Sequence, residues 1–499
     1  MAENAFVGAS DNVSVSPGSA VTYYGNFGFS AAATALAETT EANVSLVHRG
    51  ANCSLKGLRV SVTTNGRAAT SSVTTRKNGS DTSQVASITA STTGIFTDLT
   101  NAVALTDGDL GGYKLSIGST SGAFLLASIT ANLESSGQAF NHWSAAGSAS
   151  TATASATRYW PVVGQINAAF TTEVNGQSYA PAAGAGSGLR VYVTAARATA
   201  TTAKSRINAA DGAQTVSITG TGAFEDTSHS DSFSVGSLID VATVTGSGSD
   251  TLTITSIAMK FTPSTASESA LAAGPNQSTT LTSGQTRYYN PIGKLTTQAT
   301  EAVNQSPAPF SGLASNLAAV VSANASTTAA TIVLRKAGVD TALTFSIAGA
   351  ATGGFADTTH SVSSNTGDLL SIKGSGSDGT VTFRMMGLKY TAQATAWSVT
   401  AAQGAFTLTG QAAGLKHNYP LQAGHGSFAL TASDAALAWG RRMTAAHGSF
   451  ALTGQAADLL KEGSDRTLVA TGAAYALTGQ SAGLNYSGSP SWIPRIIFI

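Results

Sequence analysis

Hydrophobic and polar residues alternate with a period of two along most of the chain. Residues 58–63 (LRVSVT) and 343–347 (LTFSI) are examples, and such alternation puts one face of a β-strand on a core and the other in water. Turn signals such as Asn78-Gly79 recur between these runs, as they do between short strands. The segment 252–261 (LTITSIAMKF) changes phase after Ile254, which predicts a β-bulge there. The pattern predicts an all-β protein without amphipathic helices.

Three sets of landmarks follow one another in the same order. Each set opens with an aromatic pair, continues with a strand that begins at a leucine (Leu58, Leu189 or Leu317), and then has a Gly-x-Phe-x-Asp motif. The first and third sets share the pattern of 75–82 (TRKNGSDT) and 334–341 (LRKAGVDT), from which the second set departs. This order predicts three tandem homologous domains. About 110 residues and roughly eight short strands in each favour an antiparallel β-sandwich of the jelly-roll type.

The predicted boundaries follow the composition of the chain. Stretches rich in Ser, Ala and Gly separate the domains, and each is expected to combine a linker with the first strand of the next domain. The expected order is an N-terminal arm (1–19), sandwich repeat 1 (20–134), a linker (135–156), sandwich repeat 2 (157–263), a linker with a first strand (264–285), sandwich repeat 3 (286–392) and a repeat region (393–499).

The last region contains four copies of a shorter repeat, of which GSFALTGQAADL (448–459) is one. The aromatic residues of the copies are 22, 22 and 25 residues apart, a leucine lies nine residues after each, and an x-Gly pair precedes each. Because an x-Gly pair between alternating residues is typical of a tight hairpin turn, each repeat is expected to be a β-hairpin with a short return. One such unit cannot bury its apolar face alone, so the copies are expected to stack.

Composition narrows the classes of partner. Charged residues make up only 10% of the chain, and Lys+Arg and Asp+Glu both number 26, so the formal net charge is zero. A neutral surface of small residues has little repulsion between copies, which fits either an inert extracellular-type surface or one that packs against itself. Lys and Arg are not clustered, so no nucleic acid is expected as a partner. The only cysteine, Cys53, excludes an intrachain disulfide framework. The N-terminal residues show no positively charged region followed by an apolar one, so no signal peptide is expected, and no apolar run predicts a membrane span.

The sequence carries no signature of catalysis. The HExxH, GxxxxGK[ST] and GxSxG motifs are missing, so neither enzyme activity nor a cofactor is predicted. His229 and His360 occupy matching positions where the first copy has Asn101. Because Asn does not replace His as a metal ligand, loop capping is the favoured interpretation. The aspartates of the Gly-x-Phe-x-Asp motifs are candidates for calcium binding, but bonding to their own backbone is favoured.

The recurring aromatic residues are predicted to form the cores of the repeats rather than platforms for sugars. The candidates are Tyr24, Trp160, Tyr289, Phe96, Phe224, Phe355, Phe406, Phe428, Phe450 and Tyr475. The C-terminal peptide SGSPSWIPRIIFI gathers apolar residues, and it fits both a final strand and a peptide that docks on a neighbouring subunit. Its candidate docking residues are Trp492, Ile493, Ile496, Ile497 and Phe498.

The segments 74–82 (TTRKNGSDT), 353–362 (GxFxDTTHSV) and 367–377 (GDLLSIKGSGS) resemble jelly-roll repeats of bacteriophage structural proteins of the fibre, spike or decoration kind. These repeats are broadly similar to the trimeric C1q-like class. The FALTGQAAxL repeat resembles tail-segment repeats in phage and prophage proteins of proteobacteria. The resemblance carries no active residue. It implies a virion subunit that is made in the host cytoplasm, forms a homotrimer or a larger symmetric array, and contacts other virion proteins.

Two functions of different kinds stay open at this point. The first is a non-enzymatic structural subunit of a phage particle that acts by self-assembly and docking, with attachment to a host-surface glycan as an additional role. The second is a carbohydrate-binding adhesin or surface-layer protein of a bacterium, which would need an export route. A polysaccharide-cleaving tailspike is less favoured because no pair of carboxylates stands out.

Overall fold

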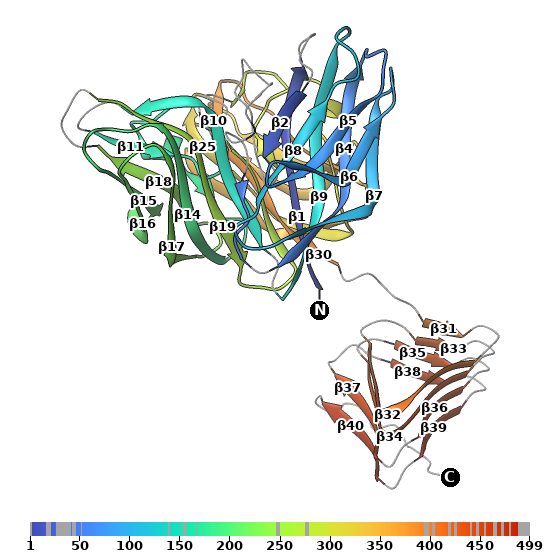
Figure 1. The fold of residues 1–499 in the computed structure, drawn as a ribbon. Helices are drawn as coiled ribbons and strands as arrows, with labels where there is room; N and C mark the ends of the chain where they lie inside the picture. The colour runs from blue at the N-terminus through green and yellow to red at the C-terminus, as the bar shows by residue number, and fades with distance from the viewer. Residues whose placement is uncertain are drawn as a thin grey trace. The chain divides into compact units, whose positions relative to one another are not determined.

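The computed structural model describes most of the chain, and its contacts divide the chain into two compact units, Met1–Gln393 and Ala394–Ile499. Both units are built from strands (Figure 1). The described residues are 2–15, 21–25, 41, 46–50, 52–137, 140–152, 156–166, 168–245, 250–274, 279–393, 399–401, 405–417, 421–423, 427–439, 442–445, 449–453, 456–462, 467–470, 474–478 and 481–487.

The first unit contains three sandwiches, each made of two sheets with an apolar core between them. In sandwich 1 the first sheet has the order β1-β9-β4-β7, and the second has β2-β8-β5-β6 with β3 beside β8. All of these pairs are antiparallel. The strands are β1 (Ala2–Val15), β2 (Val21–Gly25), β3 (Leu46–Val47), β4 (Cys53–Asn65), β5 (Ser71–Lys77), β6 (Ser80–Ile88), β7 (Gly94–Leu105), β8 (Leu110–Ser116) and β9 (Phe124–Ser136).

Sandwich 2 repeats this arrangement. Its first sheet has the order β12-β10-β19-β14-β17, and its second has β11-β18-β15-β16 with β13 beside β18. The elements are β10 (Asn141–Ala152), β11 (Thr157–Trp160), β12 (Gly164–Gln165), the 3-10 helix η2 (Glu173–Asn175), β13 (Ser178–Tyr179), β14 (Gly184–Ala195), β15 (Thr201–Ile207), β16 (Ala210–Ile218), β17 (Gly222–Phe233), β18 (Leu238–Val244) and β19 (Leu252–Pro263).

Sandwich 3 has the same plan, with the sheet orders β23-β20-β30-β25-β28, which also carries β21, and β22-β29-β26-β27, which also carries β24. The three copies confirm the predicted all-β fold with antiparallel sandwiches. The elements are β20 (Glu268–Gly274), β21 (Thr279–Leu281), β22 (Arg287–Tyr289), β23 (Gly293–Lys294), the 3-10 helix η3 (Glu301–Asn304), β24 (Ser306–Pro307), β25 (Gly312–Asn324), β26 (Ala330–Lys336), β27 (Val339–Ile347), β28 (Gly353–Ser364), β29 (Leu369–Ser375) and β30 (Val381–Ala392).

The three sandwiches share two distortions of the ladder. The residue before each landmark leucine has a left-handed backbone, with φ of 61° at Gly57, 63° at Gly188 and 51° at Asn316, and the register shifts there in each copy. The second distortion is a bulge on the neighbouring strand. In β19 the extra residue is Thr255. It follows Ile254 directly, so the predicted bulge is confirmed.

Strands occupy the segments that the composition assigned to an arm and to linkers. Residues 1–19 contain β1, which pairs with β9, and residues 135–156 contain β10. The predicted arm is therefore wrong, whereas the first strands expected within 135–156 and 264–285 are present as β10 and β20. The small residues of these segments serve close packing instead. A Cβ on Gly274 would lie 1.8 Å from the carbonyl oxygen of Val163.

The second unit is a stack of parallel strands, and the predicted hairpins are wrong. Each repeat contributes one short strand to a first sheet and a longer segment to a second sheet, and all neighbours pair in parallel. The first sheet is β31 (Val399–Ala401), β33 (Leu421–Ala423), β35 (Arg442–Ala445) and β38 (Thr467–Ala470). The second is β32 (Ala405–His417), β34 (Ser427–Trp439), β36 (Ser449–Thr453), β37 (Ala456–Glu462), β39 (Ala474–Thr478) and β40 (Ser481–Ser487).

Parallel pairing brings like residues of successive repeats together. The four repeat aromatics are register partners in sequence, and so are the four leucines that follow them. The two strands that flank the pair Gln403-Gly404, β31 and β32, lie in different sheets, so that pair does not join hairpin partners. A hairpin would pair residues within one repeat, whereas parallel stacking pairs each residue with the equivalent residue of the next repeat. The predicted stacking of copies holds.

Candidate functional site

Each sandwich of the first unit contacts both of the others, so the three form a closed ring. We call the contacts seam 1–2, seam 2–3 and seam 3–1. At seam 2–3 the short strand β13 contacts β25 and β30, and at seam 3–1 the equivalent strand β24 contacts β4 and β9. At seam 1–2 the loop after β3 reaches β17. One surface of each sandwich therefore meets a different surface of the next, which is how a head-to-tail ring closes.

Seams 1–2 and 2–3 are held by different polar contacts. Arg49 of sandwich 1 binds the Glu225 carboxylate of sandwich 2 through two N–H groups, each 2.6 Å from its oxygen, and this bond raises the pKa of Arg49 against the opposing effect of burial. The Arg49 backbone N–H also donates to Nε2 of His142 at 2.9 Å. Burial, together with neighbouring cations, lowers the pKa of His142 and keeps its ring neutral. At seam 2–3, Asn316 Nδ2 donates to the Pro181 carbonyl at 2.8 Å.

Seam 3–1 uses hydroxyl groups. Ser128 Oγ donates to the Gln305 carbonyl at 3.0 Å, and Thr130 Oγ1 donates to the Pro307 carbonyl at 2.8 Å. Both hydroxyls come from the outer face of β9, which is a face of a sandwich that water would cover in an isolated domain. In the ring this face is buried, with Ser128 and Thr130 both at 0% exposure. The sheet faces at the seams are therefore interfaces rather than free surface.

The first strands of the three sandwiches meet at a point that we call the hub, formed by β1, β10 and β20. Asn141 of β10 links the other two sandwiches: its Nδ2 donates to the Phe6 carbonyl of sandwich 1 at 2.8 Å, and its Oδ1 accepts the Ala270 N–H of sandwich 3 at 2.8 Å. Ser269 Oγ accepts the Phe6 N–H at 2.9 Å. Trp143 Nε1 donates to the Ala270 carbonyl at 2.9 Å. These bonds join all three sandwiches.

The hub bonds follow the symmetry of the ring. Ala5, Asn141 and Ser269 occupy the same register position in β1, β10 and β20, counted from the shared bulge. Asn141 reaches from sandwich 2 to sandwich 3, and Ser269 reaches from sandwich 3 to sandwich 1. The third link would run from sandwich 1 to sandwich 2, but Ala5 has no polar group to make it. The hub is thus a threefold arrangement in which two of the three equivalent side-chain hydrogen bonds are present.

Apolar packing reinforces the hub. Phe6 of sandwich 1 belongs to the core cluster of sandwich 3 rather than to its own. Its ring meets the rings of Tyr390 and Phe310 edge-on, with centroids 5.3 Å and 6.4 Å away. An aromatic side chain buried in this way contributes through its area and through the edge-to-face geometry. Seam 3–1 is therefore continuous with a hydrophobic core.

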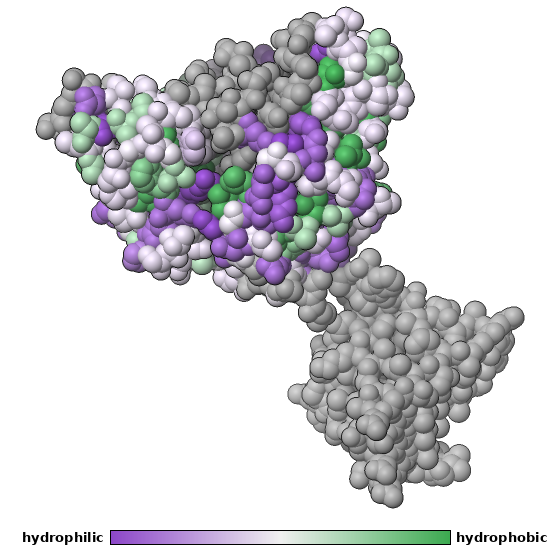
Figure 2. Space-filling model, viewed as in Figure 1, coloured by the Kyte–Doolittle hydropathy of each residue, from purple (hydrophilic) through white to green (hydrophobic). Residues whose placement is uncertain are grey.

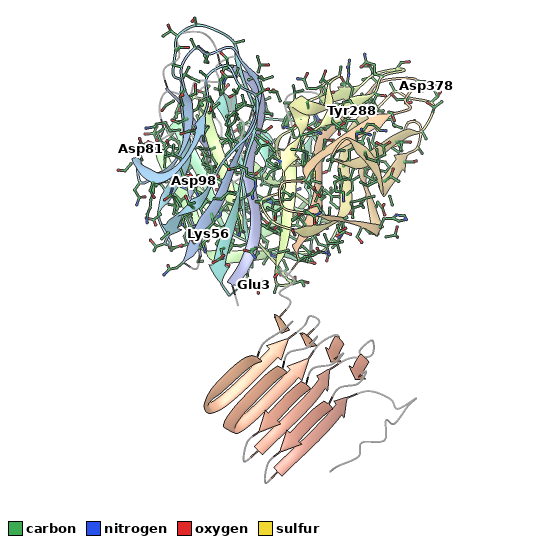
Figure 3. All side chains as sticks on the ribbon, turned by 90° about the vertical axis from the view of Figure 1, so that its right-hand side faces the viewer. Glu3, Lys56, Asp81, Asp98, Tyr288 and Asp378 are labelled. Carbon is green, nitrogen blue, oxygen red and sulfur yellow. The ribbon has the colours of Figure 1, made fainter. Side chains whose placement is uncertain are left out.

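A charged cluster recurs on the second sheet of each sandwich. An arginine binds a glutamate from the segment before the short strand and an aspartate across the β-turn. The triads are Arg76–Glu41–Asp81, Arg206–Glu173–Asp211 and Arg335–Glu301–Asp340. Figure 3 labels Asp81 of the first triad and Tyr288, over whose ring the Arg335 guanidinium lies at 5.6 Å. The second sandwich keeps the triad although its sequence lacks the Arg-Lys-x-Gly-x-Asp pattern.

A lysine completes the cluster from either of two strands. In sandwich 3, Lys373 of β29 binds Asp340, and sandwich 1 has the same arrangement on β8. In sandwich 2 the position on β18 is Ala242, and its cross-strand partner on β15, Lys204, binds Asp211 at 3.0 Å instead. The positive charge beside the aspartate is kept, although the lysine that supplies it lies on the adjacent strand. A motif search along one strand misses this exchange.

The recurring aspartates of the Gly-x-Phe-x-Asp motifs hold backbone N–H groups. Asp98 accepts from the backbone of Val85, Thr100 and Asn101 at 2.8 to 3.1 Å, and Asn101 Nδ2 donates to it at 2.9 Å. Burial raises the pKa of Asp98, but these hydrogen bonds outweigh it and hold the pKa at about 2.

The other two copies are built alike around Asp226 and Asp357, with His229 and His360 in the place of Asn101. These contacts agree with backbone capping by the motif aspartates. In the described part of the chain, no group of three or more His, Cys, Asp or Glu side chains is placed to hold a metal ion.

The structure places some of the candidate residues in cores and leaves others outside its description. Trp160 and Tyr289 are fully buried, and Phe96, Phe224 and Phe355 are half-buried against the cores. Tyr24 pairs with Tyr113 in register. Phe406, Phe428, Phe450 and Tyr475 share one register position in the second unit. Trp492, Ile493, Ile496, Ile497 and Phe498 lie outside the described residues.

The seam residues gave no signal in the sequence. Asn141, Arg49 and Thr130 lie at different places in sandwiches 1 and 2, and their side chains do not recur at equivalent positions, so a search for repeated residues passes over them. On the face shown in Figure 2, hydrophilic residues gather across the middle of the first unit and apolar residues form separate small spots. None of the described helices is long and apolar enough to cross a membrane.

Comparison with known proteins does not assign a family to this chain. No protein-family model and no curated protein matches the chain. Among solved structures, a chain from the atomic structure of Sulfolobus Turreted Icosahedral Virus aligns with 68% of this chain and 79% of its own length, at 13% identity and a TM-score of 0.13. At this TM-score the alignment carries no argument about function.

Proposed function

We propose that this protein is a non-enzymatic structural subunit of a phage particle, of the fibre, spike or decoration kind, that acts by assembly and docking. The observation that carries the proposal is the closed ring of three sandwiches, joined by buried seams and by a shared hub. Buried hydrogen bonds of the seams and the hub join the three sandwiches to one another. This use of sequence suits a building element better than an enzyme.

The second unit supports the same proposal. Its repeats stack in parallel register at a fixed spacing, so the number of repeats sets its length, as in other stacked-repeat proteins. A unit whose length is set by a repeat count is suited to spanning a distance within a particle. The neutral, weakly charged composition favours packing against other protein surfaces.

The ring limits which surfaces could join copies of this chain in the proposed homotrimer or larger array. Three sandwiches already close within one chain, so the three seams are filled and offer nothing to a second copy. We therefore propose that contacts with further copies and with other virion proteins lie outside the seams. Attachment to a host-surface glycan belongs to the same proposal as an additional role of exposed loops.

Mass spectrometry of purified particles tests the proposal. Particles from lysed cultures of the source organism are separated on a density gradient, and the particle band and the cell-surface fraction are digested in parallel. We expect peptides from both units in the particle band, in proportion to the known structural proteins. Peptides confined to the cell-surface fraction would overturn the proposal and favour an adhesin.

A further inference from the structure

One carboxyl group in sandwich 2 is buried without the partners that a carboxylate needs. Asp240 of β18 lies directly across from Arg206 of β15 and has 0% exposure. Neither of its oxygens accepts a hydrogen bond from an N–H or O–H group within the described residues. An ionised carboxylate in such a place is strongly unfavourable.

The equivalent position in sandwich 3 holds a hydrogen-bond donor. Ser371 lies directly across from Arg335, and its hydroxyl donates to Glu301 Oε1 at 2.7 Å. In sandwich 2 the place of Glu301 is taken by Glu173 of η2, which binds Arg206 at 2.9 and 3.2 Å. The glutamate oxygen next to the arginine is thus met by a hydrogen donor in sandwich 3.

We propose that Asp240 is protonated in the folded ring, donates its hydrogen to the Glu173 carboxylate, and makes seam 2–3 weaken as the pH rises. A neutral carboxylic acid supplies one O–H donor, so Asp240 then does what the serine hydroxyl does in sandwich 3. The proposal concerns this pair alone and does not depend on the proposed function.

The charges around the pair favour this assignment. Burial is the main cause that raises the pKa of Asp240, to about 8; the negative charge of Glu173 adds to the increase, and the Arg206 guanidinium opposes it. Arg206 is already shared between Glu173 and Asp211 of β16, and Lys204 of β15 binds Asp211. The cations facing the site are therefore committed to other carboxylates.

The pair is directly connected to the seam. The chain runs from Glu173 into β13, which pairs with Leu238 and Ile239, immediately before Asp240. The residue that follows β13 by two, Pro181, is the acceptor of the seam 2–3 hydrogen bond. When Asp240 loses its proton, two carboxylates meet at one guanidinium, and the segment from η2 to β13 is pushed away from β18. Seam 2–3 loosens as a result.

The pH dependence has a definite sign. The folded pKa of about 8 lies above the ordinary aspartate value of about 3.9. The folded state therefore holds a proton that the open state releases, and stability falls as the pH rises from about 4 to about 8. Above that range both states are ionised and the loss no longer grows. Asp240→Ser keeps a donor for Glu173 and has no group that titrates there.

Hydrogen exchange of the full chain tests the proposal, with wild type and Asp240→Ser compared at the same pH from 4 to 9. In the peptide 173–182 we expect the wild-type exchange rate divided by that of the variant to rise with pH, by up to about tenfold per unit, and to level off above about 8. A ratio independent of pH would overturn the protonated pair. A ratio that rises in β18 but not around Pro181 would overturn the link to the seam.

The equivalent position in sandwich 3 gives an independent test. Ser371→Asp rebuilds the acid pair beside Glu301, so we expect the exchange of residues 301–309 to acquire the same pH dependence. This variant also decides the matter if Asp240→Ser does not fold. Infrared spectra add a direct readout, because wild type at neutral pH should show the band of a protonated carboxyl group that Asp240→Ser lacks. Absence of that band in wild type would contradict the proposal.

Discussion

Asn141→Ala tests the hub, because this side chain bonds to both other sandwiches. The substitution leaves the Phe6 carbonyl and the Ala270 N–H buried without their partner. Each unsatisfied buried group costs about 1–3 kcal/mol, so we expect a loss of about 2–6 kcal/mol in the free energy that holds the sandwiches together. Ser269→Ala removes one such bond, to the Phe6 N–H, and should cost about half as much.

Amide hydrogen exchange separates these effects residue by residue. We expect the Ala270 amide to exchange faster in Asn141→Ala and the Phe6 amide to exchange faster in Ser269→Ala, since each amide loses its own acceptor. The control is Asn324→Ala, which removes two donated bonds and one accepted bond, one more than Asn141→Ala, but all within sandwich 3. If the Ala270 amide exchanged no faster in Asn141→Ala than in wild type, the claim that the hub hydrogen bonds stabilise the ring would be refuted.

Three further substitutions test other parts of the molecule. Asp98→Asn should lower the free energy of unfolding by about 2 kcal/mol at neutral pH. In urea titrations the difference between wild type and variant should disappear as the pH falls from about 4 to about 2. The reason is that the wild-type carboxylate, whose pKa is about 2, becomes protonated there. Phe6→Ala should cost about 3 kcal/mol or more by opening a cavity in the core of sandwich 3, and a midpoint equal to wild type would contradict that packing. Thr431→Pro in β34, which pairs on both sides, removes a ladder hydrogen bond and should destabilise the second unit by about 1–3 kcal/mol. The loss should be larger than for Thr409→Pro in the edge strand β32, as judged by thermal melts of each variant.

The sequence predicted the elements and the repeats because both depend on local order. Period-two alternation marks a strand wherever one face is buried, and the bulge after Ile254 was visible because it breaks that alternation. The three copies were visible because turns and backbone caps such as that of Asp98 demand the same residues in every copy. A residue that the local backbone requires therefore recurs in every copy.

Longer-range features were missed for identifiable physical reasons. Alternation does not distinguish parallel from antiparallel pairing, so the repeats of the second unit were predicted as hairpins although β32 pairs in parallel with β34. The small residues around Gly274 predicted a linker with a first strand, but not the close approach of backbones that they permit. Seam residues such as Thr130 differ among copies, because each of them matches a partner in another sandwich.

The differences among the seams give the ring a single arrangement. Three identical domains would pair in any order, since every donor surface would fit every acceptor surface. Here seam 1–2 depends on the ion pair of Arg49 and Glu225, seam 2–3 on the Asn316 amide, and seam 3–1 on hydroxyls. A wrong pairing would leave one of these groups buried without its partner, which costs more than the bond itself provides.

Joining the three sandwiches in one chain also changes how strong each seam must be. A covalent link keeps the neighbouring sandwich at a high effective concentration, so a seam that would be too weak between separate chains still closes. This allows seam 2–3 to depend on the proton that we propose for Asp240 and Glu173 within sandwich 2, while the other two seams hold the ring together. We therefore expect the exchange rate of wild type divided by that of Asp240→Ser at the same pH to rise with pH at seam 2–3 and to stay constant at Thr130 and Arg49.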